Sequence, residues 1–226
     1  VATRETTKDG ERLRFQYRDA QGEVEKSFLL GPEGRMEIVV AAPATPGFNL
    51  LLGPGLRART VEELASRFEL RRAVWSVAGE VETHDPAKAN EVLELPGETL
   101  NWVGLEDTYF LTAVVPLQPV AKARFRPVLL TPAGEPRTFD NKPVPPPPGE
   151  IAATDKDLPR DFVLELQARE GRIEATSYWG SKQLDRLTAM PYGLDKTVQL
   201  GMFGFLARPL LYSLQWIYAN VVSNYG

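Results

Sequence analysis

The only histidine of the chain is His84, and it lies in the stretch Glu82-Thr83-His84-Asp85-Pro86. General acid–base chemistry needs a second titratable group held in reach, and a metal site needs several ligands at regular spacing. One histidine beside carboxylates, in a polar stretch that ends in a proline, has neither. We therefore predict a solvated loop histidine, and no catalytic, cofactor-binding or metal-binding residue.

Other catalytic patterns are absent from the sequence. The chain has no cysteine, which excludes disulfides, zinc fingers and thiol catalysis. It has no Gly-x-Ser-x-Gly elbow, and Gly53-Pro54-Gly55 is followed by Leu56 and Arg57 rather than by the Gly-Lys-Ser of a phosphate loop. The acidic pairs Glu62/Glu63 and Asp155/Asp157 have no apolar surroundings that would raise a pKa. The sequence favours a protein that is not an enzyme.

The formal charge of −4 and the lack of a basic block exclude nucleic acid as a partner, because phosphate neutralisation needs clustered lysine and arginine. The chain starts at Val1, and residues 1–20 contain no apolar run of signal-peptide length. We therefore expect an excised fragment, whose location has to be inferred from the remaining sequence.

Short strands are predicted over most of residues 1–180, with glycine and proline between them at the intervals typical of a β-sandwich. One hairpin is predicted around Asp19-Ala20-Gln21-Gly22 and a last one around Glu170-Gly171. The predicted strands are 12–18, 23–30, 35–41, 48–52, 72–78, 90–95, 100–103, 108–116, 121–130, 161–168 and 172–179. A short helix is predicted over 61–68, where Thr60 and Glu63 form a capping box.

The tract 142–149 (KPVPPPPG) contains five prolines. Proline cannot donate to a strand ladder, so we predict extended polyproline backbone here. The tract is either a surface loop or a docking site for a proline-recognising partner.

The sequence becomes helical after Trp179. Ser181 is the predicted N-cap of a helix over 182–190. Residues 200–222 hold a single charged residue, Arg208, and a helix over 203–222 gathers apolar side chains on one face. These side chains are Phe203, Leu206, Ala207, Leu210, Leu211, Leu214, Ile217, Tyr218 and Val221.

Three interpretations of this helix compete. A transmembrane helix is opposed by Arg208, Gln215 and Asn220, which would lie in hydrocarbon. The apolar stripe equally fits a core helix packed on the β-domain or a helix lying in the membrane interface. Trp216 and Tyr218 are aromatic types that settle at headgroup depth. Composition alone does not separate the second interpretation from the third.

Four aromatic residues, Trp75, Trp102, Tyr109 and Phe110, form a candidate groove for a sugar or an extended peptide. The alternative is plain core packing, since aromatic residues dominate sandwich interiors.

The order of motifs in the last 50 residues resembles one known family. The motifs are SYWGSK at 177–182, Tyr192-Gly193-Leu194-Asp195, Phe203-Gly204, Pro209-Leu210, Trp216-Ile217-Tyr218 and Asn224-Tyr225-Gly226. NWVGLEDTYFLTAVVP at 101–116 and LGPG at 52–55 agree with the same pattern. The sequence resembles the large periplasmic domain of YidC membrane-protein insertases, up to the second transmembrane helix. Ser181 departs from the family, which often has proline there.

The resemblance implies a mainly β fold, a β-supersandwich similar to galactose mutarotase, with C-terminal helices. It implies a β-domain over 1–180, and over 181–226 a helical linker with an amphipathic interface helix leading to a missing transmembrane helix. The expected membrane-interface residues are Phe203, Leu206, Arg208, Leu210, Leu214, Trp216, Ile217 and Tyr218.

The resemblance also implies the parent's function, which is to insert and fold inner-membrane proteins, alone or with the Sec translocon (SecYEG and SecDF). The expected place is the periplasmic side of the inner membrane of a Gram-negative bacterium. The expected partners are Sec components, nascent inner-membrane proteins through the parent, and the bilayer interface. Two rivals are a carbohydrate-binding or sugar-epimerising protein of the same fold, and a free periplasmic chaperone with its tail helix folded onto the sandwich.

Overall fold

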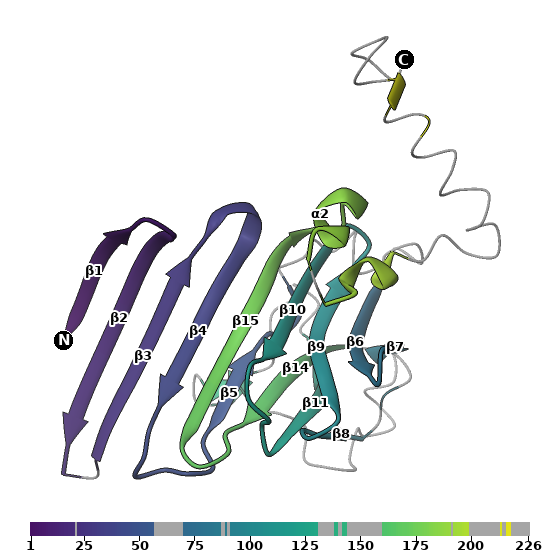
Figure 1. The fold of residues 1–226 in the computed structure, drawn as a ribbon. Helices are drawn as coiled ribbons and strands as arrows, with labels where there is room; N and C mark the ends of the chain where they lie inside the picture. The colour runs from purple at the N-terminus through teal and green to yellow at the C-terminus, as the bar shows by residue number, and fades with distance from the viewer. Residues whose placement is uncertain are drawn as a thin grey trace.

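A computed structural model of the chain describes residues 1–20, 22–56, 70–86, 89, 91–130, 138–139, 142–143, 160–190, 192–198, 213 and 216–217. Its larger sheet is fully antiparallel, with the strand order β1-β2-β3-β4-β15-β10-β9-β6-β7 (Figure 1). The bounds are β1 Ala2–Thr7, β2 Gly10–Asp19, β3 Gly22–Leu30, β4 Arg35–Ala41, β15 Arg172–Ser181, β10 Phe110–Pro116, β9 Leu100–Asp107, β6 Arg71–Val77 and β7 Glu80–His84.

The smaller sheet has the order β5-β14-β11-β8 and is also antiparallel. Its strands are β5 Asn49–Leu52, β14 Arg160–Gln167, β11 Lys122–Leu129 and β8 Leu93–Pro96. A separate two-residue pair joins β12 Thr138–Phe139 to β13 Lys142–Pro143. The short helices of the described part are η1 Pro32–Gly34, α2 Leu184–Thr188 and η4 Leu194–Thr197. The prediction of a mainly β fold is confirmed.

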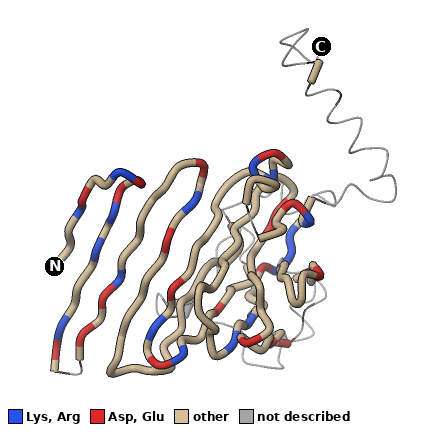
Figure 2. Tube along the Cα trace, viewed as in Figure 1, with Lys and Arg blue, Asp and Glu red and all other residues tan. Residues whose placement is uncertain are grey.

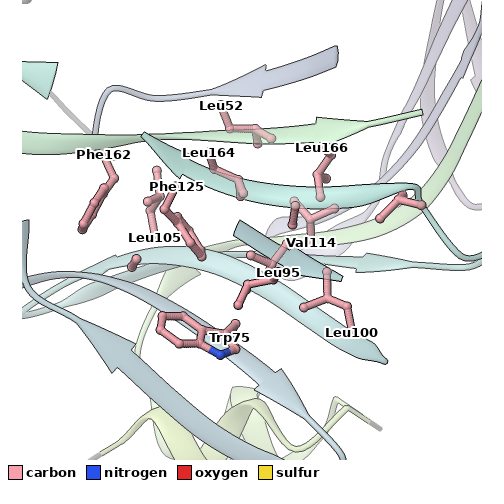
Figure 3. Close-up of a cluster of buried hydrophobic side chains, with 14 of the residues drawn as sticks. Leu52, Trp75, Leu95, Leu100, Leu105, Val114, Phe125, Phe162, Leu164 and Leu166 are labelled. Atoms are coloured by element: carbon pink, nitrogen blue, oxygen red, sulfur yellow. The ribbon is translucent and has the colours of Figure 1, made fainter. Parts of the chain in front are cut away.

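The two sheets pack face to face around an apolar core (Figure 3). Trp75 of the larger sheet meets Phe125 of the smaller one at 5.7 Å between ring centroids, and Phe125 lies edge-on to Phe162 at 5.9 Å. Side chains alternate between the two faces of a strand, so Trp75 points inward and its neighbours Val74 and Ser76 point outward. We call the face toward the smaller sheet the inner face and the opposite one the outer face.

The first hairpin forms as predicted, since Asp19 pairs with Gly22 in the register of β2 and β3. The carboxylate oxygen Oδ1 of Asp19 accepts a hydrogen bond from the backbone N–H of Gly22 at 3.1 Å, and Gly22 has φ +142°, a conformation that favours glycine. The local turn chemistry was therefore readable from the sequence.

The structure differs from the predicted elements in three respects. β1 and β7 were not predicted, because their polar sequences lack apolar alternation. Ser181 is not a helix N-cap but the last residue of β15, and α2 starts at Leu184 with Gln183 as its N-cap. The proline tract begins in a strand, because Lys142 and Pro143 pair with Phe139 and Thr138. The predicted helix over 61–68 and residues 144–149 lie outside the described residues.

Candidate functional site

The expected membrane-interface residues are described only in part. Trp216 and Ile217 are helical, with 62% and 42% of their surface exposed. Phe203, Leu206, Arg208, Leu210, Leu214 and Tyr218 lie outside the described residues. The interface helix therefore stays a prediction.

The four candidate groove aromatics do not come together. Trp75 is buried on the inner face of the larger sheet, and Trp102 is buried on its outer face. Tyr109 and Phe110 lie at the turn between β9 and β10, and both are exposed. Each of the two tryptophans is packed in an apolar cluster, Trp75 between the sheets and Trp102 on the outer face.

His84 is not a loop residue. It ends the edge strand β7 and is half-buried, and its ring lies 5.9 Å from that of Phe162 in the core. The loop prediction relied on Pro86, but the strand continues to His84 and ends two residues before this proline. Among the described residues no group of three or more histidine, aspartate or glutamate side chains is arranged to hold a metal ion.

The structure does bring the family-like motifs together, at the place where the chain leaves β15. In the Asp-x-Tyr-Phe stretch, Oδ1 of Asp107 accepts hydrogen bonds from the backbone N–H groups of Tyr109 and Phe110, both at 2.7 Å. This arrangement closes the β9–β10 turn. The Tyr109 carbonyl then accepts a hydrogen bond from the N–H of Lys182 at 2.7 Å, which ties the turn to the end of the SYWGSK motif.

A buried ion cluster lies beside that turn. The side chain of Glu106 has no exposed surface, and its two oxygens accept from Arg72 at 2.6 Å and from the Lys182 ammonium at 2.9 Å. Arg72 belongs to β6, Glu106 to β9, and Lys182 follows β15. A carboxylate taken out of water needs such pairing, because an unpaired buried charge is very costly. The cluster therefore joins three segments that are distant in sequence.

A second apolar cluster covers the outer face of the larger sheet. Trp102 has no exposed surface, and its indole Nε1 donates to the carbonyl of Tyr192 at 3.1 Å. Leu187 of α2 and Leu194 of η4 are buried against it. The segment after β15 is thus folded back onto the sheet, and the full cluster consists of Val74, Trp102, Leu111, Ala113, Val115, Tyr178, Leu187 and Leu194.

A polar contact holds the far end of this segment on the β6–β7 turn, and a second hydrogen bond fixes that turn to β9. The ammonium of Lys196 donates to the carbonyl of Gly79 at 2.6 Å, and Oδ1 of Asn101 accepts from the N–H of Gly79 at 3.0 Å. Beside them lies a hollow of about 240 Å³ lined by Ser76, Gly79, Asn101, Trp102, Tyr192, Gly193 and Lys196. The Lys196 contact holds the segment in place, and the residues that line the hollow include no carboxylate or histidine for acid–base chemistry. We call the segment 181–198 the junction.

Tyr178 supports the start of the junction. Its hydroxyl donates to the carbonyl of Ser181 at 2.6 Å, and a Cβ on Gly180 would come within 2.7 Å of the Tyr178 hydroxyl oxygen. The glycine of the motif thus leaves room for the ring. Burial of the hydroxyl raises the pKa of Tyr178 above its ordinary value near 10.

The replacement Tyr178→Phe is expected to lower the free energy of unfolding by about 1 kcal/mol, because one buried hydrogen bond is lost. Since the pKa of Tyr178 is raised in the folded state, this residue stabilises the fold fully below pH 10 and loses that contribution as pH rises further. Urea unfolding at pH 8 and above pH 10 measures both effects. A variant as sensitive to alkali as the wild type would contradict this assignment.

From the sequence, Lys182 was recognised as part of a motif, but Arg72 and Glu106 were not identified as members of a buried ion cluster. A signal was present, because Glu106 directly follows the apolar run WVGL within a buried strand. A charge at such a position usually has a buried partner. Its partners could not be named, because Arg72 and Lys182 lie 34 and 76 residues away in the chain.

Fold and junction together define a two-sheet β domain in which the segment after the last strand is firmly attached to the larger sheet. The family model "YidC periplasmic domain" matches residues 8–213, and the chain belongs to this family. A membrane protein insertase YidC of Nitratidesulfovibrio vulgaris is 27% identical over 206 residues, covering 90% of this chain and 32% of that protein.

Two further relatives bear the same name. The insertase of Thioalkalivibrio sulfidiphilus is 32% identical over 126 residues, which is 55% of this chain and 19% of that protein. That of Anaeromyxobacter sp. (strain Fw109-5) is 25% identical over 235 aligned positions, 99% of this chain and 38% of that protein. The chain spans about a third of the length of the relatives it matches over most of its own. Among the described residues, no helix has the length and apolar character needed to cross a bilayer.

Proposed function

We propose that this chain is a non-catalytic scaffold domain of a bacterial inner-membrane insertase, located on the periplasmic side. The parent would insert and fold inner-membrane proteins, alone or beside SecYEG and SecDF, and the domain would offer docking surface to these partners. The names of the relatives support the parent's activity. The two packed sheets are consistent with a β-supersandwich of the galactose-mutarotase type.

The observation that carries the scaffold role is the junction. Residues 181–198 are held on the sheet by the Glu106 ion cluster at one end and by the Lys196 contact at the other. A segment fixed at both ends gives whatever follows it a defined starting position. We propose that residues 203–222 follow as an amphipathic helix in the membrane interface, so that the domain sets where the next membrane span begins.

The interface helix is tested by flotation of the whole chain with phospholipid vesicles. The double variant Leu210→Glu/Leu214→Glu places charges on the proposed apolar face. We expect its partition onto vesicles to fall roughly 100-fold, because two leucine side chains no longer enter the acyl boundary.

The matched control is Gln215→Glu/Ala219→Glu, which adds the same charge at the same i, i+4 spacing on the opposite face of the helix. Its partition is expected to stay within a few-fold of the wild type. Equal flotation of the two double variants would contradict the proposed interface helix.

A further inference from the structure

The three N-terminal strands of the larger sheet form a wing, β1–β3, that extends beyond the smaller sheet (Figure 1). None of its residues belongs to the core cluster between the sheets. The registers Phe15↔Lys26, Tyr17↔Val24 and Leu13↔Phe28 place these side chains on one face of the wing. That face continues the inner face of the sheet, because Phe28 pairs with Ile38 of β4, and Ile38 pairs with Ala175 in the core.

This face of the wing is apolar and open. Phe15 and Tyr17 are 44% and 63% exposed, and the rings of Phe15 and Phe28 meet edge-on at 6.2 Å. They surround a hollow of about 580 Å³ lined by Val1, Ala2, Phe15, Gln16, Tyr17, Val24, Lys26 and Phe28. A contiguous exposed apolar surface with aromatic side chains is typical of a docking surface.

Both faces of the wing carry charge, but the charges differ in position. The registers Arg4↔Leu13 and Thr6↔Glu11 place the Arg4–Glu11 ion pair on the apolar face, where the two charges neutralise each other. The opposite face is lined by Arg12, Arg14, Glu25, Ser27 and Glu37, and Arg14 pairs with Glu25 at 3.4 Å. Figure 2 shows both signs of charge along these strands. On the apolar face, no acidic residue lines the hollow, and Lys26 makes no ion pair among the described residues. The part of the apolar face around the hollow therefore complements a partner that is apolar and carries negative charge.

A second copy of this chain added edge to edge fits poorly. Antiparallel self-pairing of β1 that keeps the apolar faces on one side places Arg4 opposite Arg4, or Glu5 opposite Glu5, in the registers that use most of the strand. Like charges directly opposite each other destabilise a strand pair.

We propose that the apolar face of the wing docks on the surface of an anionic phospholipid bilayer. Phe15 and Tyr17 enter the headgroup region, and Lys26 meets lipid phosphates with its stem along the apolar surface. An interfacial helix works by the same division into an apolar and a charged face. The wing lies on β1–β3 and shares no residue with the junction, so this contact goes beyond the scaffold role.

The chain has no cysteine, so a single introduced one reports on one position. Val24→Cys puts a fluorophore on the apolar face, and Glu23→Cys puts it on the opposite face one residue away. Each labelled full-length chain is mixed with phosphatidylcholine vesicles, with and without phosphatidylglycerol, that carry a lipid-borne quencher. We expect strong quenching of the label at position 24 on anionic vesicles and little at position 23.

The contribution of the Lys26 charge to vesicle binding is tested with the variant Lys26→Glu. Its matched control is Arg18→Glu, on the opposite face of the same hairpin. Lys26→Glu is expected to weaken binding to anionic vesicles about tenfold, measured by quenching at position 24, because a phosphate attraction becomes a repulsion. Arg18→Glu should change it far less.

Three outcomes would overturn the proposal. They are equal quenching at positions 23 and 24, no response to Lys26→Glu, or protection of position 24 by self-association or by an apolar peptide in place of vesicles. Because the label reports from the wing alone, these outcomes are independent of whether residues 203–222 bind lipid.

Discussion

The variant Glu106→Ala is expected to lose about 3–5 kcal/mol of the free energy of unfolding, because it leaves two cations inside the protein without their carboxylate. The Arg72 and Lys182 side chains are only 15% and 10% exposed, so neither reaches water without movement of the backbone. Chemical denaturation monitored by tryptophan fluorescence measures the loss. We also expect the segment after β15 to loosen, because Lys182 is its first residue.

The control for Glu106→Ala is Glu94→Ala. Glu94 also pairs with two cations, accepting from Arg124 at 2.7 Å and Lys122 at 3.0 Å, and these hydrogen bonds lower its pKa. Its side chain is half exposed, so water replaces the lost partners and the effect should be far smaller. Both glutamates pair with two cations, and we expect removal of the buried one to lower the free energy of unfolding far more than removal of the exposed one. Similar stability losses for Glu106→Ala and Glu94→Ala would contradict the importance of the buried cluster.

The variant Trp102→Ala is expected to cost about 3–5 kcal/mol, because it removes a fully buried ring from between the sheet and the returning segment. It also removes the donor to the Tyr192 carbonyl. Since Leu187 and Leu194 pack in the same cluster, we expect the junction to detach before the sandwich unfolds. Trypsin cleavage after Arg186 and Lys196, in parallel with global unfolding, separates the two events.

Trp179→Ala is the matched control for this variant. Trp179 is 41% exposed, and its indole N–H bonds the Ser177 hydroxyl at 2.8 Å. It lies in the same motif as Tyr178 but contributes no surface to the outer-face cluster. Its loss should leave cleavage in the junction unchanged. If Trp102→Ala unfolds the whole domain without earlier junction cleavage, the junction is not a separate unit.

Local sequence signals located most strands within a few residues. β4 was predicted with the bounds that the structure has, and β2, β3, β10 and β14 differ by three residues or fewer at either end. Apolar alternation and turn chemistry act over neighbouring residues, so they can be read directly from the sequence. β1 and β7 escaped this reasoning because their polar sequences show no apolar alternation, and each is held as a strand by pairing with a neighbour at an edge of the sheet.

The candidate groove shows the limit of such reasoning. Trp75 and Trp102 occupy neighbouring strands of one sheet, and their register sends one inward and the other outward. A shift of a single residue in that pairing would turn one strand over relative to the other and place both tryptophans on one face. Composition contains no information about this register, so the four aromatics could be recognised as important but not assigned to one site.

The sequence by itself determined that this is a mainly β chain without cysteine or a basic block, and its motif order identified the family that the comparison confirms. Those features depend on residue types and on spacing along the chain. Only the tertiary structure decided that Glu106 links Arg72 to Lys182, and that the wing presents Phe15 and Tyr17 on an open face. Both depend on which strands become neighbours, and strand order is set by packing of the whole sheet rather than by any local stretch.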